Sequence, residues 1–69
     1  MNFITGQYYK ASSLGKWAIW LCEGKVLRLI CTNQHHYENY TMETSEASIH
    51  CDWEPISFEE LEENKARVL

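Results

Sequence analysis

The chain lacks any long apolar run. Its longest uncharged apolar stretch, residues 17–22, is far shorter than the roughly 20 residues that a membrane-spanning helix needs. The opening MNFITGQYYK contains no apolar segment of the kind found at the centre of a signal peptide. From these two absences we expect a soluble protein of the cytoplasm with no membrane partner.

The sequence also lacks the short motifs of catalytic sites: nucleophile elbow, glycine-rich phosphate-binding loop and H-E-x-x-H pair. His50, Cys51 and Asp52 are suitable residue types, but they are contiguous, whereas a catalytic triad needs side chains that converge in space. A chain of 69 residues also has little interior from which to form a deep pocket. We predict one domain, residues 1–69, that is not an enzyme and needs no cofactor.

The chain has three cysteines, and an odd number of cysteines without an export signal indicates reduced thiols. Zinc binds thiolate and imidazole ligands in tetrahedral sites. The least unsuitable set of such residues is Cys22, Cys31, His35 and Cys51. No C-x2-C pair is present, so we predict no metal site and cysteines that act as small apolar residues. In this prediction Cys22 and Cys31 share one face of a hairpin.

Basic residues are few, with six against ten acidic residues and a net charge of −4. Eight of the acidic residues lie in residues 43–69. The plainest interpretation is a solvated acidic helix. The alternatives are an acidic surface directed at a basic partner, or one that imitates a nucleic-acid backbone.

The sequence does contain a strongly β-forming stretch, KWAIWLCEGKVLRLIC at residues 16–31. Its two apolar runs flank Glu23 and Gly24, which predicts a β-hairpin with either a tight turn or a bulged three-residue loop at Gly24, so the register stays open. If Glu23 and Gly24 form a two-residue loop, Trp20 lies opposite Leu27. One predicted face carries Ala18, Trp20, Cys22, Leu27, Leu29 and Cys31. The other carries Trp17, Ile19, Leu21, Val26, Arg28 and Ile30. Because both faces are apolar, a curled sheet, the terminal helix or a partner must cover the second one.

Three further strands are predicted from residue type and alternation, over residues 7–10, 37–42 and 47–53, with a polar loop at 43–46. The last strand places Ile49 on its buried side and ends before Pro55. A C-terminal helix follows, with Ser57 as its N-cap and Glu60 completing a capping box. Ile56 and Leu61 would form a hydrophobic staple. The helix would dock through a sparse apolar stripe, Phe58, Leu61 and Val68.

Both ends of the chain carry a resemblance. The pattern F-x-x-G-x-Y-Y-K, from Phe3 through Lys10, resembles the start of small uncharacterised proteins of large T4-like tailed phages. The pattern W-x-P-I-S-x-E-E-L, at residues 53–61, resembles the closing strand and helix of small SH3-like domains. Together they imply a phage accessory protein that binds and inhibits or redirects a host protein in the host cytoplasm, and they transfer no functional residue.

The predicted fold class is mainly β (α+β), a small antiparallel curled sheet or SH3-like barrel with a short C-terminal helix. The predicted function is a non-enzymatic protein-interaction module, with self-association into a homodimer as one use of the surplus apolar face. The candidate contact residues are Tyr8, Tyr9, Trp17 and Trp20, with an acidic rim of Glu59, Glu60, Glu62 and Glu63. The alternative function is single-stranded nucleic-acid binding through a basic and aromatic sheet face, formed by Tyr8, Tyr9, Lys10, Lys16 and Arg28.

Overall fold

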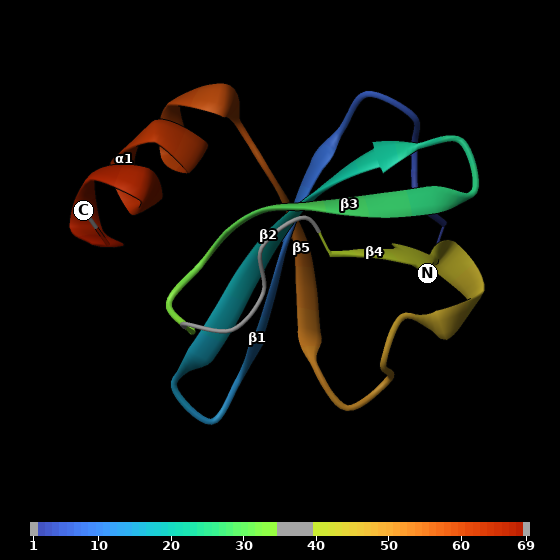
Figure 1. The fold of residues 1–69 in the computed structure, drawn as a ribbon, viewed down its shortest axis with the longest axis horizontal. Helices are drawn as coiled ribbons and strands as arrows, with labels where there is room; N and C mark the ends of the chain where they lie inside the picture. The colour runs from blue at the N-terminus through green and yellow to red at the C-terminus, as the bar shows by residue number, and fades with distance from the viewer. Residues whose placement is uncertain (1, 35–39, 69) are drawn as a thin grey trace.

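In the described part of the chain, five antiparallel strands form one curled, unclosed sheet, and a short helix follows them at the C-terminal end (Figure 1). The structure is a computed structural model that describes residues 2–34 and 40–68. Its strands are β1 (Tyr8–Ser13), β2 (Lys16–Glu23), β3 (Val26–Thr32), β4 (Thr41–Glu43) and β5 (Asp52–Ile56), followed by α1 (Phe58–Val68). The strand order is β4-β3-β2-β1-β5. The predicted fold class is therefore confirmed, as an open curled sheet.

The predicted central hairpin of β2 and β3 is confirmed, and the structure shows its register, which the sequence left open. Glu23 pairs with Val26, so the two-residue loop is Gly24 and Lys25. Gly24 has φ +66, and a glycine with positive φ at the first loop position is typical of a type II′ turn. Trp20 consequently faces Leu29, and the register that would have placed it opposite Leu27 does not occur.

A β-bulge then divides the apolar residues of β3 between the two faces of the sheet. The register shifts between Ile19 and Trp20, so that Ile19 pairs with Cys31 and Ile30 is the extra residue. Cys31 therefore lies with Ile19 on one face, while Cys22 lies on the other. The prediction that both thiols share one face is wrong, because simple alternation does not anticipate an inserted residue.

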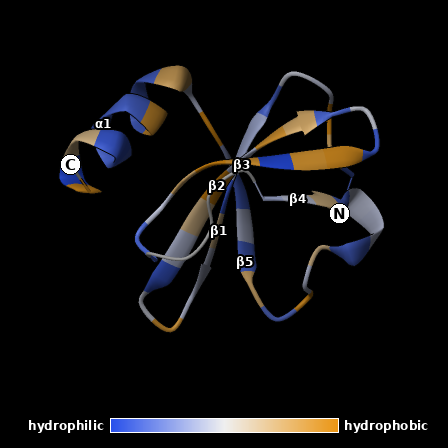
Figure 2. Cartoon of the chain, viewed as in Figure 1, coloured by the Kyte–Doolittle hydropathy of each residue, from blue (hydrophilic) through white to orange (hydrophobic). Residues whose placement is uncertain are grey.

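Each face of the sheet carries its own apolar cluster. One cluster consists of Tyr9, Ala11, Trp20, Cys22 and Leu27. The other consists of Ile19, Cys31, Ile56 and Leu61. The helix α1 supplies Leu61 and covers this second face, and in Figure 2 apolar colouring recurs along β2 and β3. The first face is bounded by the curl of the sheet and by residues 44–51, which connect its two edge strands.

The last strand begins later than predicted and continues through the proline. Residues 47–51 form a loop, and Ile49 is 91% exposed where the prediction placed it in the core. The carbonyl of Ser48 accepts from the indole N–H of Trp53 at 2.8 Å, and its hydroxyl accepts from the N–H of His50 at 3.1 Å. Such local bonds compete with strand pairing. Pro55 is tolerated within β5 because β5 is an edge strand.

The other boundaries also shift. The first strand runs to Ser13 instead of ending at residue 10, because it pairs with β2 on one side and β5 on the other. The predicted strand over 37–42 corresponds to β4 at its end, and residues 37–39 lie outside the described residues. The predicted loop at 43–46 contains a short 3-10 turn, η1 (Thr44–Glu46).

Ser57 caps the helix as predicted, but the inward face of the helix differs. The N–H of Glu60 donates to Ser57 Oγ at 3.2 Å, and Leu61 is buried in one cluster with Ile56, as the staple requires. Phe58 and Val68 are exposed, so the predicted three-residue stripe is wrong. The second inward position belongs to Asn64, three residues after Leu61. Its Oδ1 accepts from Lys10 Nζ at 3.1 Å, which ties α1 to β1.

The β1–β2 turn contains a strained residue. Ser13 pairs with Lys16, so Leu14 and Gly15 form the loop, with φ values of 51° and 79°. Two positive φ values are typical of a type I′ turn, which favours Asn-Gly. A leucine in this conformation is unfavourable, and Leu14 is also 98% exposed.

We therefore predict that Leu14→Asn raises the free energy of unfolding by about 1 kcal/mol, because asparagine tolerates the left-handed conformation. Urea unfolding at equilibrium measures the change. Leu14→Ala is the control, since it removes the exposed side chain but keeps a residue that disfavours positive φ. A lower unfolding free energy for Leu14→Asn than for the wild type would contradict this account of the turn.

Candidate binding groove

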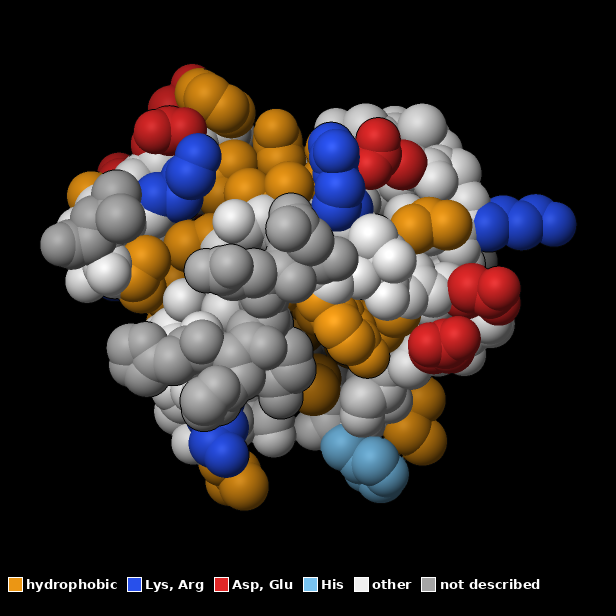
Figure 3. Space-filling view, in the orientation of Figure 1, with side chains coloured by type: hydrophobic (Ala, Val, Ile, Leu, Met, Phe, Trp, Pro, Cys, Tyr) orange, Lys and Arg blue, Asp and Glu red, His pale blue; other side chains and the backbone are white. Residues whose placement is uncertain are grey.

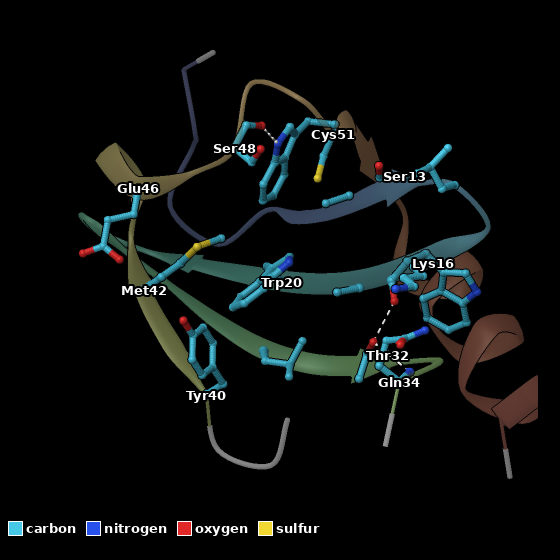
Figure 4. Close-up of a pocket in the computed structure, with 16 residues that line it drawn as sticks. Ser13, Lys16, Trp20, Thr32, Gln34, Tyr40, Met42, Glu46, Ser48 and Cys51 are labelled. Atoms are coloured by element: carbon cyan, nitrogen blue, oxygen red, sulfur yellow. Dashed lines mark hydrogen bonds between the residues drawn. The ribbon is translucent and has the colours of Figure 1, made fainter. Parts of the chain in front are cut away.

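The face of the sheet opposite α1 holds an open groove of about 480 Å³ (Figure 4). Its floor consists of Ala11, Ala18, Trp20 and Leu29, from the three central strands. One wall consists of Tyr40 and Met42, and the other of Ser48, Cys51 and Trp53. Since the walls come from the two opposite edges of the sheet, the groove follows from the curl.

Small residues create the depth of the groove. Ala11 on β1 pairs with Ala18 on β2 and with Trp53 on β5. Trp20 follows two residues after Ala18 on the same face of β2. Two alanine side chains therefore lie between two large indoles, which leaves space above the sheet.

The aromatic side chains of the groove are held in place by specific contacts. The Trp53 indole donates to the carbonyl of Ser48 at 2.8 Å and packs edge-to-face on Phe3, with ring centroids 5.2 Å apart. The ring of Tyr40 packs edge-to-face on Trp20 at 5.9 Å. Fixed aromatic rings lose little conformational entropy when a ligand binds, so this lining is suited to binding.

Two charged side chains of opposite sign line the groove. Lys16 and Glu46 lie at opposite ends of it, on the two sides of Trp20 in Figure 4. Neither forms an ion pair with another residue in 2–34 or 40–68. Both charges therefore remain available to groups that enter the groove.

The structure separates the four aromatic residues predicted as one contact surface. Trp20 lines the groove floor with 8% exposure, and Trp17 lies at its margin. Tyr9 belongs to the core with 2% exposure, and its hydroxyl accepts from the N–H of Ile4 at 2.8 Å. Tyr8 is half-buried on the other face, with its ring 6.4 Å from that of Phe58. Alternation along β1 explains why neighbouring tyrosines separate.

The four glutamates predicted as an acidic rim lie on α1, and all are exposed: Glu59, Glu60, Glu62 and Glu63. Figure 3 shows acidic side chains gathered over this helix. Because α1 packs on the face opposite the groove, these carboxylates do not border it. Sequence reasoning missed Leu29, Tyr40 and Met42 as lining residues. Tyr40 and Met42 could have been found only from the pairing of β3 with β4.

Most residues of the predicted nucleic-acid face already have partners within the chain. Lys10 Nζ lies 5.0 Å from the centre of the Trp17 ring and donates to Asn64. Arg28 Nε lies 2.9 Å from Glu23 Oε1. Tyr9 is buried. Of the five residues of the predicted nucleic-acid face, Lys16 is the one whose side chain is exposed on the groove side of the sheet.

The cysteines do not converge. Cys22 and Cys31 belong to clusters on opposite faces of the sheet, and Cys51 lies in the groove wall. His35 lies outside the described residues. Within the part of the chain that the structure describes, no group of three histidine, cysteine or acidic side chains could hold a metal ion.

Comparison with known proteins adds no relative: no family model, no curated protein and no solved structure matches this chain. The resemblances to small phage proteins and SH3-like domains therefore stay predictions. Among residues 2–34 and 40–68, no helix is long and apolar enough to cross a membrane.

Burial on the α1 side affects the Cys31 thiol. Desolvation raises the pKa of the Cys31 thiol above its ordinary value of 9.0, and the nearby Lys65 charge opposes this shift. Below that value the thiol is protonated in both states. As the pH rises through it, the unfolded chain loses the proton first, so the free energy of unfolding falls.

We therefore predict that the unfolding free energy of the wild type falls more between about pH 8 and pH 10 than that of Cys31→Ala. Urea unfolding at the two pH values measures the difference. Ile30→Ala, which removes apolar volume at the neighbouring position, should keep the wild-type pH dependence. Equal falls for the wild type and Cys31→Ala would show that the thiol stays accessible to solvent.

Proposed function

We propose that this protein is a non-enzymatic protein-interaction module that binds a segment of a partner protein in the groove. The observation that carries the proposal is the asymmetry of the sheet. One apolar face is covered by α1, whereas the other keeps an open groove with Trp20 in its floor and Trp53 in its wall.

The composition of the groove supports a protein ligand. Tryptophan, tyrosine and methionine are enriched at protein interfaces, and tryptophan and tyrosine often carry most of the binding energy. The groove contains Trp20, Trp53, Tyr40 and Met42 together. Its volume of about 480 Å³ suits a few side chains of an inserted segment.

Leu14 gives separate support. It lines one end of the groove, is 98% exposed and occupies a turn position that asparagine fills at lower cost. A residue that lowers stability is often found where binding requires it. We propose that Leu14 extends the apolar surface of the groove toward the partner. The resemblance of the N-terminal pattern to small phage proteins makes a host protein the expected partner.

A groove-blocking substitution tests the proposal. Peptides are first selected for binding to the wild type from a displayed random library, and their affinity is then measured for Ala18→Arg. Because Ala18 lies in the floor, an arginine there fills the groove, and we predict at least a tenfold loss of affinity, about 1.4 kcal/mol.

The matched control is Ala66→Arg, the same change at an exposed position on α1. It should bind the selected peptides as the wild type does, and circular dichroism should show that both variants are folded. Undiminished binding by Ala18→Arg would place the contact surface elsewhere and contradict the proposal.

A further inference from the structure

We infer that the groove takes an extended segment with an apolar centre, a basic residue at the Glu46 end and an acidic residue at the Lys16 end. This inference rests on the proposed function and adds the chemistry of the partner. Its basis is the distribution of charge on the two faces of the sheet, which the strand register determines.

At one end of the groove, Lys16 is the charged residue on the groove face. It pairs with Ser13, which lies on the same face of β1 as Ala11, so its side chain projects on the groove side. Asp52, the nearest acidic residue in the register, pairs with Ser12 and therefore belongs to the opposite face. The end marked by Lys16 thus presents a positive charge to an incoming segment.

Glu46 provides the opposite charge at the other end. It follows β4 in η1 and lines the groove beside Met42. Glu43 and Arg28 are close in the chain or the sheet, but each lies one residue from a groove-lining position, so alternation directs them to the other face. The end marked by Glu46 thus presents a negative charge.

The dimensions of the molecule limit the length of the bound segment. The molecule measures 29 × 23 × 21 Å, and an extended chain advances roughly 3.3 Å per residue, so about six to nine residues cross it, depending on the direction. The lining between the two charged ends is mainly apolar, with Trp20, Leu29 and Trp53 at its centre. A segment with central leucine or aromatic residues would bury them there while its charged ends stay near solvent.

Four labelled seven-residue peptides test the inference by fluorescence anisotropy. They share the centre Ala-Leu-Trp-Leu-Ala and carry lysine and glutamate, two lysines, two glutamates or two serines at their ends. For the wild type we expect the mixed-charge peptide to bind most tightly. Each exposed ion pair is expected to contribute roughly twofold to fivefold in affinity, and the preference should weaken at high salt.

Two substitutions should switch this preference. Lys16→Glu makes both ends of the groove acidic, so the peptide with two lysines should become the tightest ligand. Glu46→Lys makes both ends basic, so the peptide with two glutamates should become the tightest. The matched controls are Lys25→Glu and Glu59→Lys, which change the net charge equally but lie outside the groove. Both should keep the wild-type order.

The outcomes separate this inference from the proposed function. An unchanged order in Lys16→Glu, or the same switch in Lys25→Glu, would overturn the inference, and so would failure of all four peptides to bind. If all four bind equally and Ala18→Arg abolishes that binding, the inference fails while the proposed function stands. A dimer in sedimentation that Ala18→Arg converts to a monomer would make a second copy the occupant and also overturn it.

Discussion

The structure depends on a central ribbon, β2 and β3, that is apolar on both faces, and the described residues provide one α-helix to cover it. Burial of apolar surface is the main favourable term in folding, so each face needs its own cover. On one face α1 supplies Leu61 to a cluster with Ile19 and Cys31. On the other, the sheet curls around Trp20 and leaves a groove.

Two local features convert this constraint into a site. The bulge at Ile30 moves Cys31 to the helix side, while Leu29 and Thr32 on either side of the bulge line the groove. The pairing of Ala11 with Ala18 keeps the floor low beside two indoles. A larger residue at either alanine would fill the space, which is why Ala18→Arg is informative. The acidic helix faces away from this site, and its four glutamates are exposed to solvent.

Sequence reasoning predicted the elements that local chemistry specifies. The β-rich hairpin, the Ser57 cap and the mainly β class followed from residue type and capping preference. Sequence reasoning failed where contacts between distant parts of the chain determine the local structure. The alternation around Ile49 resembled a strand, but the Ser48 hydrogen bonds favour a loop there. The candidate site was predicted only in part, through Trp20 and Trp17, because its walls come from strands at opposite edges of the sheet and strand order cannot be read from alternation.

The central claim is that the open groove, and not the helix, is the contact surface. Titration of the isotopically labelled protein with a selected peptide, followed by NMR, tests it most directly. Our account predicts that the indole N–H signals of Trp20 and Trp53 and the amide of Leu29 shift most, with α1 unaffected. The largest shifts on α1, at Glu59 to Glu63, with the groove signals unchanged would contradict it.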